Sequence, residues 1–185
     1  METELAKYLH ELGVLKRVQR SGWWLVGVKQ AENVAEHSFR TAAIAYFLAG
    51  LEKADILTAV TMALFHDAGE ARVNDLHRLG RSYVDFAGVE EKVIADQTRR
   101  LPRKMASHLR RLFKEMCERK TREARVANDA DLIECLLQAC EYAEQGYPVD
   151  DWIQSTAREV TTRSAKKLAR AILKVRSDSW RSAFP

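Results

Sequence analysis

The clearest chemical signal in the sequence is a histidine beside an aspartate at the end of an apolar segment. Residues 63–65 are apolar, and His66, Asp67 and Glu70 follow them. At the end of a helix, His66 and Glu70 can face the same space because they are four residues apart. His66 and Asp67 can share a metal ion that lies between their two directions, and Gly69 lets the helix relax there. The same pattern also fits a polar helix cap, so the choice between a metal site and a cap depends on other residues.

Further metal-ligand candidates lie on other predicted helices. His37 falls in the first turn of a helix that begins with a capping box formed by Asn33 and Glu36. Asp129 and Asp131 lie beside the apolar stripe of a long helix, where an aspartate is costly unless it is paired or bound to a metal. Two imidazoles and two carboxylates would suit Mn, Fe, Co, Zn or Ni. The residue types leave open which of the two aspartates takes part.

An all-α fold is predicted by apolar residues that recur with helical spacing in a chain with only eight Gly and three Pro. One stretch, residues 20–28, has extended or strand-like character. Residues 72–88 are predicted to form a long loop, and the chain from Ser177 is predicted to fray. The predicted helices cover about residues 5–12, 33–50, 55–66, 89–99, 102–116, 122–145 and 150–175.

Two of these segments contain further residues suited to substrate binding. The extended stretch contains Arg20, Trp23 and Trp24, which could form a flat wall with a cation for phosphate. The alternative is core packing by tryptophan, which we expect more for Trp24 than for Trp23. The long loop contains Asp75, together with His77, Arg78 and Arg81, and structureless loops of this length are usually functional.

Composition limits the class of protein. The 185 residues are 46% hydrophobic and 30% charged, which predicts one globular domain spanning residues 1–185. No apolar run approaches the roughly 18 residues of a membrane span, and no signal peptide is visible. The three cysteines form no CxxC pair, so we expect reduced thiols in the cytoplasm.

The charge is concentrated in one region. Residues 99–125 contain eleven Lys or Arg and three Glu, a local charge of +8, whereas the rest of the chain carries −4. Phosphate, nucleic acid or an acidic protein could bind such a region. We favour the simpler interpretation of a solvated helix face.

Four blocks of the sequence resemble one known family. The chain from about residue 5 to 145 is similar to the HD-domain metal phosphohydrolases, which are all-α helical bundles, and most closely to their YfbR-like 5′-deoxynucleotidase subgroup. The blocks are Leu15-Lys16-Arg17-Val18, Arg20-Ser21-Gly22-Trp23, Glu32-Asn33-Val34-Ala35-Glu36-His37-Ser38 and His66-Asp67-Ala68-Gly69-Glu70.

The resemblance implies a role for particular residues. A downstream Leu-Gln-Ala segment at the family spacing selects Asp131 over Asp129. Two departures are visible: Asn74 stands where the family commonly has Gly, and two residues separate Arg20 from Trp23, which are adjacent in some members. The implied metal ligands are His37, His66, Asp67 and Asp131, the implied catalytic acidic residues are Glu70 and Asp75, and the implied phosphate and sugar contacts are Arg20 and Trp23.

The implied activity is hydrolysis of deoxynucleoside 5′-monophosphates with one divalent transition metal, Co, Mn, Zn, Fe or Ni. The resemblance also implies a cytoplasmic homodimer with a small nucleotide as substrate, and neither a membrane nor a nucleic-acid partner. Three alternatives remain open: an HD phosphohydrolase for another nucleotide or small phosphate ester, a non-catalytic nucleotide- or nucleic-acid-binding module that uses residues 99–125, and a purely structural metal site.

Overall fold

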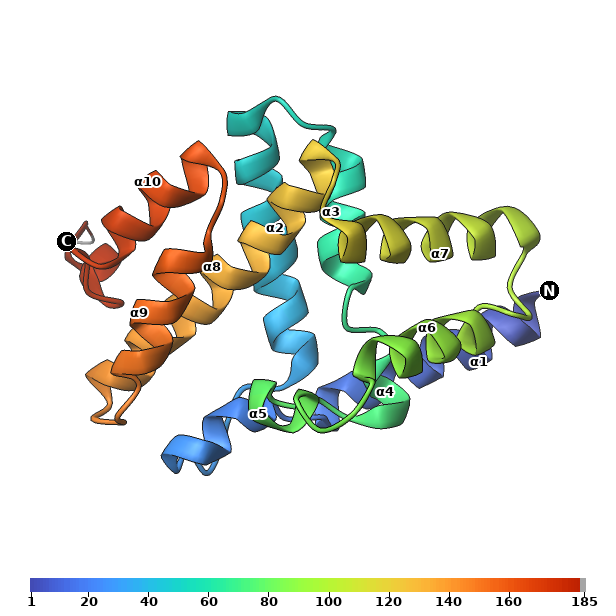
Figure 1. Cartoon of the computed structure of the whole chain (residues 1–185), viewed down its shortest axis with the longest axis horizontal. Helices are drawn as coiled ribbons and strands as arrows, with labels where there is room; N and C mark the ends of the chain where they lie inside the picture. The colour runs from blue at the N-terminus through green and yellow to red at the C-terminus, as the bar shows by residue number, and fades with distance from the viewer. Residues whose placement is uncertain (184–185) are drawn as a thin grey trace.

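The predicted all-α fold is confirmed. The computed structural model describes residues 1–183, apart from the side chains of residues 86, 87 and 183, and over this part of the chain it contains helices and no β-strand. Figure 1 shows the two chain ends at opposite sides of the molecule. The α-helices are α1 (Glu2–Leu12), α2 (Val34–Glu52), α3 (Ile56–Phe65), α4 (Glu70–Val73), α5 (Arg78–Arg81), α6 (Phe86–Gln97), α7 (Arg103–Glu118), α8 (Arg122–Glu144), α9 (Asp150–Glu159) and α10 (Arg163–Ile172).

Helices α2, α3 and α8 form the centre of the molecule. In Figure 1, α9 and α10 lie on one side of this centre, and α1, α6 and α7 lie on the other. The main hydrophobic core joins the inner faces of the three central helices to α7 and α10, and it includes Leu48, Met62, Ile133 and Leu136. This core therefore fixes the positions of the three helices that lead to the candidate metal ligands.

None of the described helices combines the length and apolar character needed to cross a lipid bilayer.

Residues 20–28 are not extended, which corrects the prediction made from their composition. Ser21–Val26 is a 3₁₀ helix that ends at Gly27 in the left-handed conformation, with φ of 82°. The extended backbone lies just before it: the amide of Arg20 donates to the carbonyl of Glu32 at 2.9 Å, and the amide of Val34 donates to the carbonyl of Val18 at 2.8 Å. This bridge ties the 3₁₀ helix to the start of α2.

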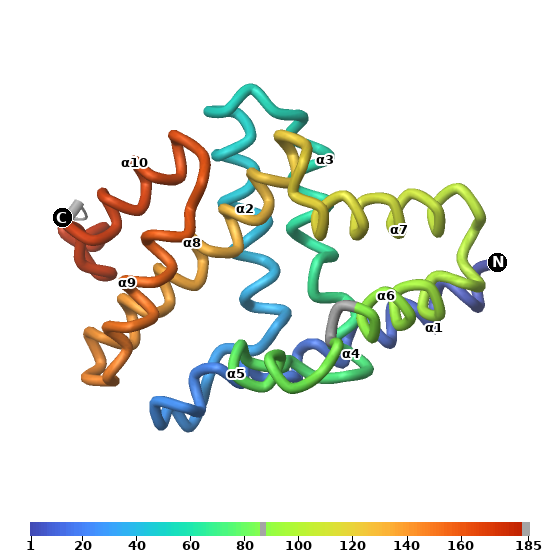
Figure 2. The backbone as a smooth tube through the Cα atoms, viewed as in Figure 1, coloured from blue at the N-terminus to red at the C-terminus, as the bar shows by residue number. Residues whose placement is uncertain are grey.

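The predicted loop over residues 72–88 is wrong in most of its length. It contains the end of α4, all of α5 and the beginning of α6, which Figure 2 traces along the lower edge of the molecule. His77 Nδ1 caps α5 by accepting a hydrogen bond from the Gly80 amide, and Asp85 caps the start of α6 by accepting one from the Gly88 amide. Helices α4 and α5 have only four residues each, so a search for apolar periodicity does not find them, and α6 begins three residues before the predicted helix over 89–99.

Several predicted helix boundaries also need correction. Helix α2 continues past Gly50 to Glu52 and ends at Lys53, which has φ of 55°. The predicted C-terminal helix is two helices, α9 and α10, and α9 is preceded by Val149 rather than capped by Asp150. The expected frayed tail contains a 3₁₀ helix over Ser179–Ala183.

Asp129 explains the break between α9 and α10. Its buried carboxylate accepts hydrogen bonds from the amides of Thr161, at 2.8 Å, and Thr162, at 2.7 Å. Thr162 in turn caps α10 by accepting a hydrogen bond from the amide of Ala165. This buried aspartate thus anchors the turn that brings α10 back onto the core.

We expect Asp129→Ala to destabilise the protein by about 3 kcal/mol, because the amides of Thr161 and Thr162 would lose their buried acceptor. Urea unfolding followed by circular dichroism measures this change. Asp150→Ala, in the exposed first turn of α9, is the matched control and should cost less than about 1 kcal/mol. Equal costs for the two variants would show that Asp129 does not anchor the turn.

Candidate metal centre

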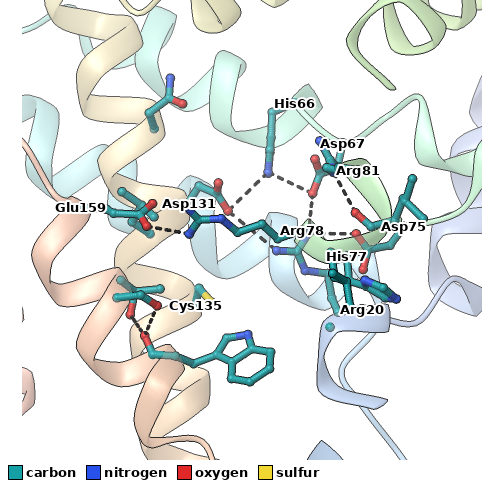
Figure 3. Close-up of a pocket in the computed structure, with 18 of the residues that line it drawn as sticks. Arg20, His66, Asp67, Asp75, His77, Arg78, Arg81, Asp131, Cys135 and Glu159 are labelled. Atoms are coloured by element: carbon teal, nitrogen blue, oxygen red, sulfur yellow. Dashed lines mark hydrogen bonds and ion pairs between the residues drawn. The ribbon is translucent and has the colours of Figure 1, made fainter. Parts of the chain in front are cut away.

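Four predicted ligands from three helices converge at one point. His37 lies in the first turn of α2, His66 and Asp67 directly follow α3, and Asp131 lies on α8. His66 Nε2 lies 3.0 Å from an oxygen of Asp67 and 3.8 Å from an oxygen of Asp131. His37 Nε2 lies 3.1 Å from the same Asp131 oxygen and 3.7 Å from the same Asp67 oxygen. Figure 3 shows the His66 ring pointing between the two carboxylates.

The second nitrogen of each imidazole is held by an acceptor. His37 Nδ1 lies 2.5 Å from Glu134 Oε2, and His66 Nδ1 lies 2.7 Å from the carbonyl oxygen of Ala63. Since both partners are acceptors, each Nδ1 donates a hydrogen bond to its partner, and each Nε2 faces the shared space. This arrangement is typical of metal-binding histidines.

The four side chains fit a divalent cation. His66 Nε2 is buried and makes no hydrogen bond in the described structure. One donor atom each from His37, His66 and Asp67 lies within 4.8 Å of the others, close enough for a single ion to contact all three. Two nitrogens and two carboxylate oxygens suit a transition metal such as Mn, Fe, Co, Zn or Ni.

The electrostatics of the cluster also favour a cation. Burial and Arg20 oppose protonation of His37, but Glu134 and Asp131 outweigh them and raise its pKa to about 10. Burial alone would raise the pKa of Asp131, but the neighbouring His37 and His66 lower it to about 2. Asp67 is similar: His66 and Arg20 outweigh its burial and hold its pKa far below the ordinary value. The site attracts positive charge.

A cavity of about 840 Å³ opens onto the centre, and its lining includes His66, Asp67 and Asp131. This volume lies within the range of small-molecule sites. Figure 3 shows Arg78 of α5 and Glu159 of α9 meeting at the cavity wall, where Arg78 Nη1 lies 2.7 Å from Glu159 Oε1. The cavity therefore reaches from the metal centre to the surface between α5 and α9.

Arg20 lies among the acidic side chains of the cavity. Its guanidinium is 3.2 Å from Asp67, 3.7 Å from Asp75 and 4.0 Å from Asp131. Asp75 also accepts a hydrogen bond from the amide of Ser21 at 2.5 Å, so it holds the segment that carries Arg20. These contacts bring Arg20 and Asp75 to the mouth of the metal centre, as Figure 3 shows.

Glu70 is not part of the cavity lining, but it interacts electrostatically with Asp67, Asp75 and Arg20, which are. Its side chain is fully buried at the start of α4, and Oε1 accepts a hydrogen bond from Arg81 Nη2 at 3.3 Å, whereas Oε2 has no hydrogen-bond partner among the described residues. Burial, with the charges of Asp67 and Asp75, raises the pKa of Glu70 well above its ordinary value. Glu70 is thus a buried carboxylate of increased basicity beside a metal-ligand residue.

Trp23 is the buried tryptophan of the pair, and Trp24 is the exposed one. Trp23 is only 3% exposed and packs against Tyr142, with its indole Nε1 donating to Glu32 at 3.0 Å, whereas Trp24 is 55% exposed. The expectation that Trp24 would be the more buried of the two is therefore wrong. Trp23 still contributes to the cavity lining, beside Trp152 of α9, whose ring centroid lies 5.9 Å away. The sequence alone did not predict that Trp152 lines the cavity.

The structure separates the two aspartates that the residue types left open. Asp131 points into the metal centre, whereas Asp129 anchors the turn before α10. Five of the eleven basic residues of the region 99–125 lie on α7, where Arg111 pairs with Glu115 and Lys114 pairs with Glu118 at the surface. These pairs are typical of a solvated helix face.

Glu134 and Arg40 are site residues that sequence reasoning missed. The Arg40 guanidinium of α2 donates to Glu134, Gln138 and Glu141 of α8, so it clamps the two helices that carry His37 and Asp131. Glu134 follows Asp131 by three residues and therefore shares its helix face, which is the signal that could have identified it.

We expect Glu134→Gln to weaken metal binding by about 10–100-fold, because the carboxylate that orients His37 would be lost. Calorimetric titration of metal into the chelator-treated protein measures the affinity. Glu141→Gln is the matched control, since Glu141 also binds Arg40 and is not a partner of His37. An unchanged affinity in Glu134→Gln would contradict a role for this residue in orienting the ligand.

Comparisons with known proteins match this region of the chain. A family model described as HD domain matches residues 12–176, a range that includes all four converging ligands. The 5′-deoxynucleotidase HDDC2 of Homo sapiens is 31% identical over 160 residues, which cover 83% of this chain and 76% of that protein. The protein of the same name from Dictyostelium discoideum is 30% identical over 150 residues, which cover 77% and 79%.

A solved structure has the same fold. A conserved hypothetical protein from Pyrococcus furiosus is 27% identical to this chain with a TM-score of 0.78, and the alignment covers 92% of this chain and 99% of that one.

Proposed function

This chain belongs to the HD domain family, and from that membership we propose that it is a metal-dependent 5′-deoxynucleotidase. The reaction is hydrolysis of a deoxynucleoside 5′-monophosphate to the deoxynucleoside and inorganic phosphate. The observation that carries this proposal is the convergence of two imidazole Nε2 atoms and two carboxylates at the base of a cavity. The relatives named 5′-deoxynucleotidase, at about 30% identity over most of the chain, support the choice of substrate.

His37, His66, Asp67 and Asp131 would hold one divalent transition-metal ion. When bound, such an ion supplies charge neutralisation at the phosphoryl group and increases the acidity of water. Four protein ligands leave positions open on a six-coordinate ion, which favours a catalytic over a closed structural site. Its identity among Co, Mn, Zn, Fe and Ni stays a prediction from the ligand types.

The chain supplies the remaining groups. Arg20, beside Asp67 at the cavity mouth, would bind two phosphate oxygens through two of its guanidinium nitrogens. Glu70, whose pKa is raised by burial and by Asp67 and Asp75, would orient the attacking water and accept its proton. Asp75 would keep Arg20 in place and complete the acidic pair.

The nucleoside would occupy the part of the cavity beside α9. Trp23 and Trp152 lie next to one another there, and an apolar wall of this kind suits a sugar ring and base. We infer that close packing of the sugar on this wall disfavours a ribose 2′-hydroxyl. The resemblance further implies that each chain forms a single HD domain and that two chains form a cytoplasmic homodimer.

Phosphate release from dAMP, dCMP and dTMP and from their ribose counterparts tests the substrate class. We expect turnover of the deoxy substrates, at rates well above those of the ribose forms. Equal turnover of the deoxy and ribose substrates would show that Trp23 and Trp152 do not discriminate against the ribose 2′-hydroxyl. Absence of turnover in the metal-loaded protein, with salt-sensitive binding to single-stranded DNA, would instead assign a binding function to residues 99–125.

A further inference from the structure

Cationic side chains cover the outer side of α10 and the turn that follows it. Residues 160–177 contain six Lys or Arg and no Asp or Glu. Positions 166, 167, 170 and 174 recur with helical spacing, so their side chains share one side of the helix. These four exposed residues, which we call the α10 basic face, are Lys166, Lys167, Arg170 and Lys174.

The opposite side of α10 fixes the orientation of this face. Ala165 and Ala169 are buried in the main hydrophobic core, and Leu168 and Ile172 pack against the same core. These four apolar positions also recur with helical spacing, so the apolar stripe is turned inward and the α10 basic face outward. Figure 1 shows α10 at an outer edge of the molecule, where this face is open to a partner.

The four cations of the α10 basic face form no ion pair with a carboxylate of the described chain. Arg163, in the first turn of α10, is not counted with them because it interacts electrostatically with Glu52. The basic residues of α7 differ, since Arg111 and Lys114 each pair with a glutamate one turn further along that helix. Positive charges grouped in this way without acidic neighbours favour an anionic partner.

Large apolar side chains lie next to the α10 basic face. Leu173 and Val175, which directly follow α10, are 50% and 58% exposed. Trp180 is 64% exposed and belongs to the 3₁₀ helix over Ser179–Ala183, which Figures 1 and 2 show beside the end of α10. Cationic side chains beside Trp and Leu are typical of segments that bind at the surface of a lipid bilayer.

The shape of this region favours a membrane over nucleic acid. Proteins bind single-stranded nucleic acid in grooves where aromatic rings stack on the bases. The α10 basic face is instead the convex side of a single helix, and Leu173 and Val175 have no ring that could stack. A bilayer presents a broad surface that accepts aliphatic side chains below its headgroups.

We propose that the α10 basic face, together with Leu173, Val175 and Trp180, binds the surface of a membrane that contains anionic phospholipids. The four cations contact the headgroups, and the apolar side chains insert at the boundary between headgroups and acyl chains. This binding goes beyond the proposed nucleotidase activity and does not depend on the metal centre. It departs from the expectation that no membrane takes part, which came from a resemblance over about residues 5 to 145, before α10 begins.

Cosedimentation of the full chain with lipid vesicles tests the proposal. We expect binding to phosphatidylcholine vesicles with about 30% phosphatidylserine, little binding to phosphatidylcholine alone, and weaker binding as salt rises from about 0.05 to 0.5 M. Lys166→Gln combined with Lys167→Gln should weaken binding by about 25-fold, because each cation near an anionic surface contributes about fivefold.

Two further variants make the test specific. Arg111→Gln combined with Lys114→Gln is the matched control, since it removes the same charge from paired residues of α7, and its binding should stay within about twofold of the wild type. Leu173→Ser tests the apolar contribution and should weaken binding by about tenfold. Circular dichroism should show native helix content in all of these variants, because the replaced side chains are exposed or lie at the surface.

Three results would overturn the proposal. The first is a wild type that does not sediment with the phosphatidylserine vesicles at about 0.1 M salt. The second is unchanged vesicle binding in the Lys166→Gln, Lys167→Gln variant while the fold is intact. The third is binding to single-stranded DNA that is tighter than binding to the vesicles and is lost in the same variant, which would assign the α10 basic face to nucleic acid.

Discussion

Asp67→Ala is expected to abolish metal binding and, with it, phosphate release. Asp67 faces the shared space, because one of its oxygens is 3.0 Å from His66 Nε2 and 3.7 Å from His37 Nε2. Its loss removes a ligand, so metal affinity should fall by more than the roughly 10–100-fold that an outer-sphere change costs. Turnover should fall by at least about 10³-fold, since a bound metal typically supplies several kcal/mol of transition-state stabilisation.

Metal content after dialysis and calorimetric titration measure the first effect, and phosphate release measures the second. Asp75→Asn is the matched control, because Asp75 also pairs with Arg20 but lies outside the group of converging donors. We expect this control to bind metal as the wild type does. Stoichiometric metal at wild-type affinity in Asp67→Ala would show that the ion binds elsewhere.

Glu70→Gln is expected to lower kcat by about 10²–10⁴-fold, the usual contribution of a general base, while metal affinity stays near that of the wild type. The amide keeps the size of the side chain and can still accept the Arg81 hydrogen bond, but it cannot accept a proton. The loss should therefore appear in kcat rather than in KM, and the fold should be unchanged.

Glu90→Gln separates this effect from a general change in charge. Glu90 also pairs with Arg81, at 3.6 Å, and lines the cavity, so its replacement alters the same arginine. We expect Glu90→Gln to keep most of the wild-type kcat. If both variants lose activity equally, the position of Arg81 rather than proton transfer by Glu70 is the important factor.

The helices that carry the metal ligands could be predicted because their signals are local. Asn33 and Glu36 form the capping box that starts α2, and the apolar run of α3 ends where His66 begins. Periodicity also placed Asp131 on a helix. The choice of Asp131 over Asp129 came only from the resemblance, since both are aspartates beside one apolar stripe and only tertiary contacts distinguish them.

The parts that could not be predicted depend on contacts between distant segments. Burial of Trp23 depends on Tyr142 and Glu32, and no local rule distinguishes it from Trp24. The 3₁₀ helix over Ser21–Val26 is held by an amide contact to Asp75, which is far away in the sequence. Short helices such as α5 depend on single capping side chains, and they lack the two turns that a periodicity search needs.

Metal reconstitution tests the metal dependence of the reaction most directly. The protein is stripped of metal with a chelator, and Co²⁺, Mn²⁺ or Zn²⁺ is added back while phosphate release from dAMP is followed. We expect no turnover in the stripped protein and recovery that saturates at one equivalent of at least one of these ions. Turnover that survives chelation, or none with any ion despite one bound equivalent, would contradict a metal-dependent 5′-deoxynucleotidase.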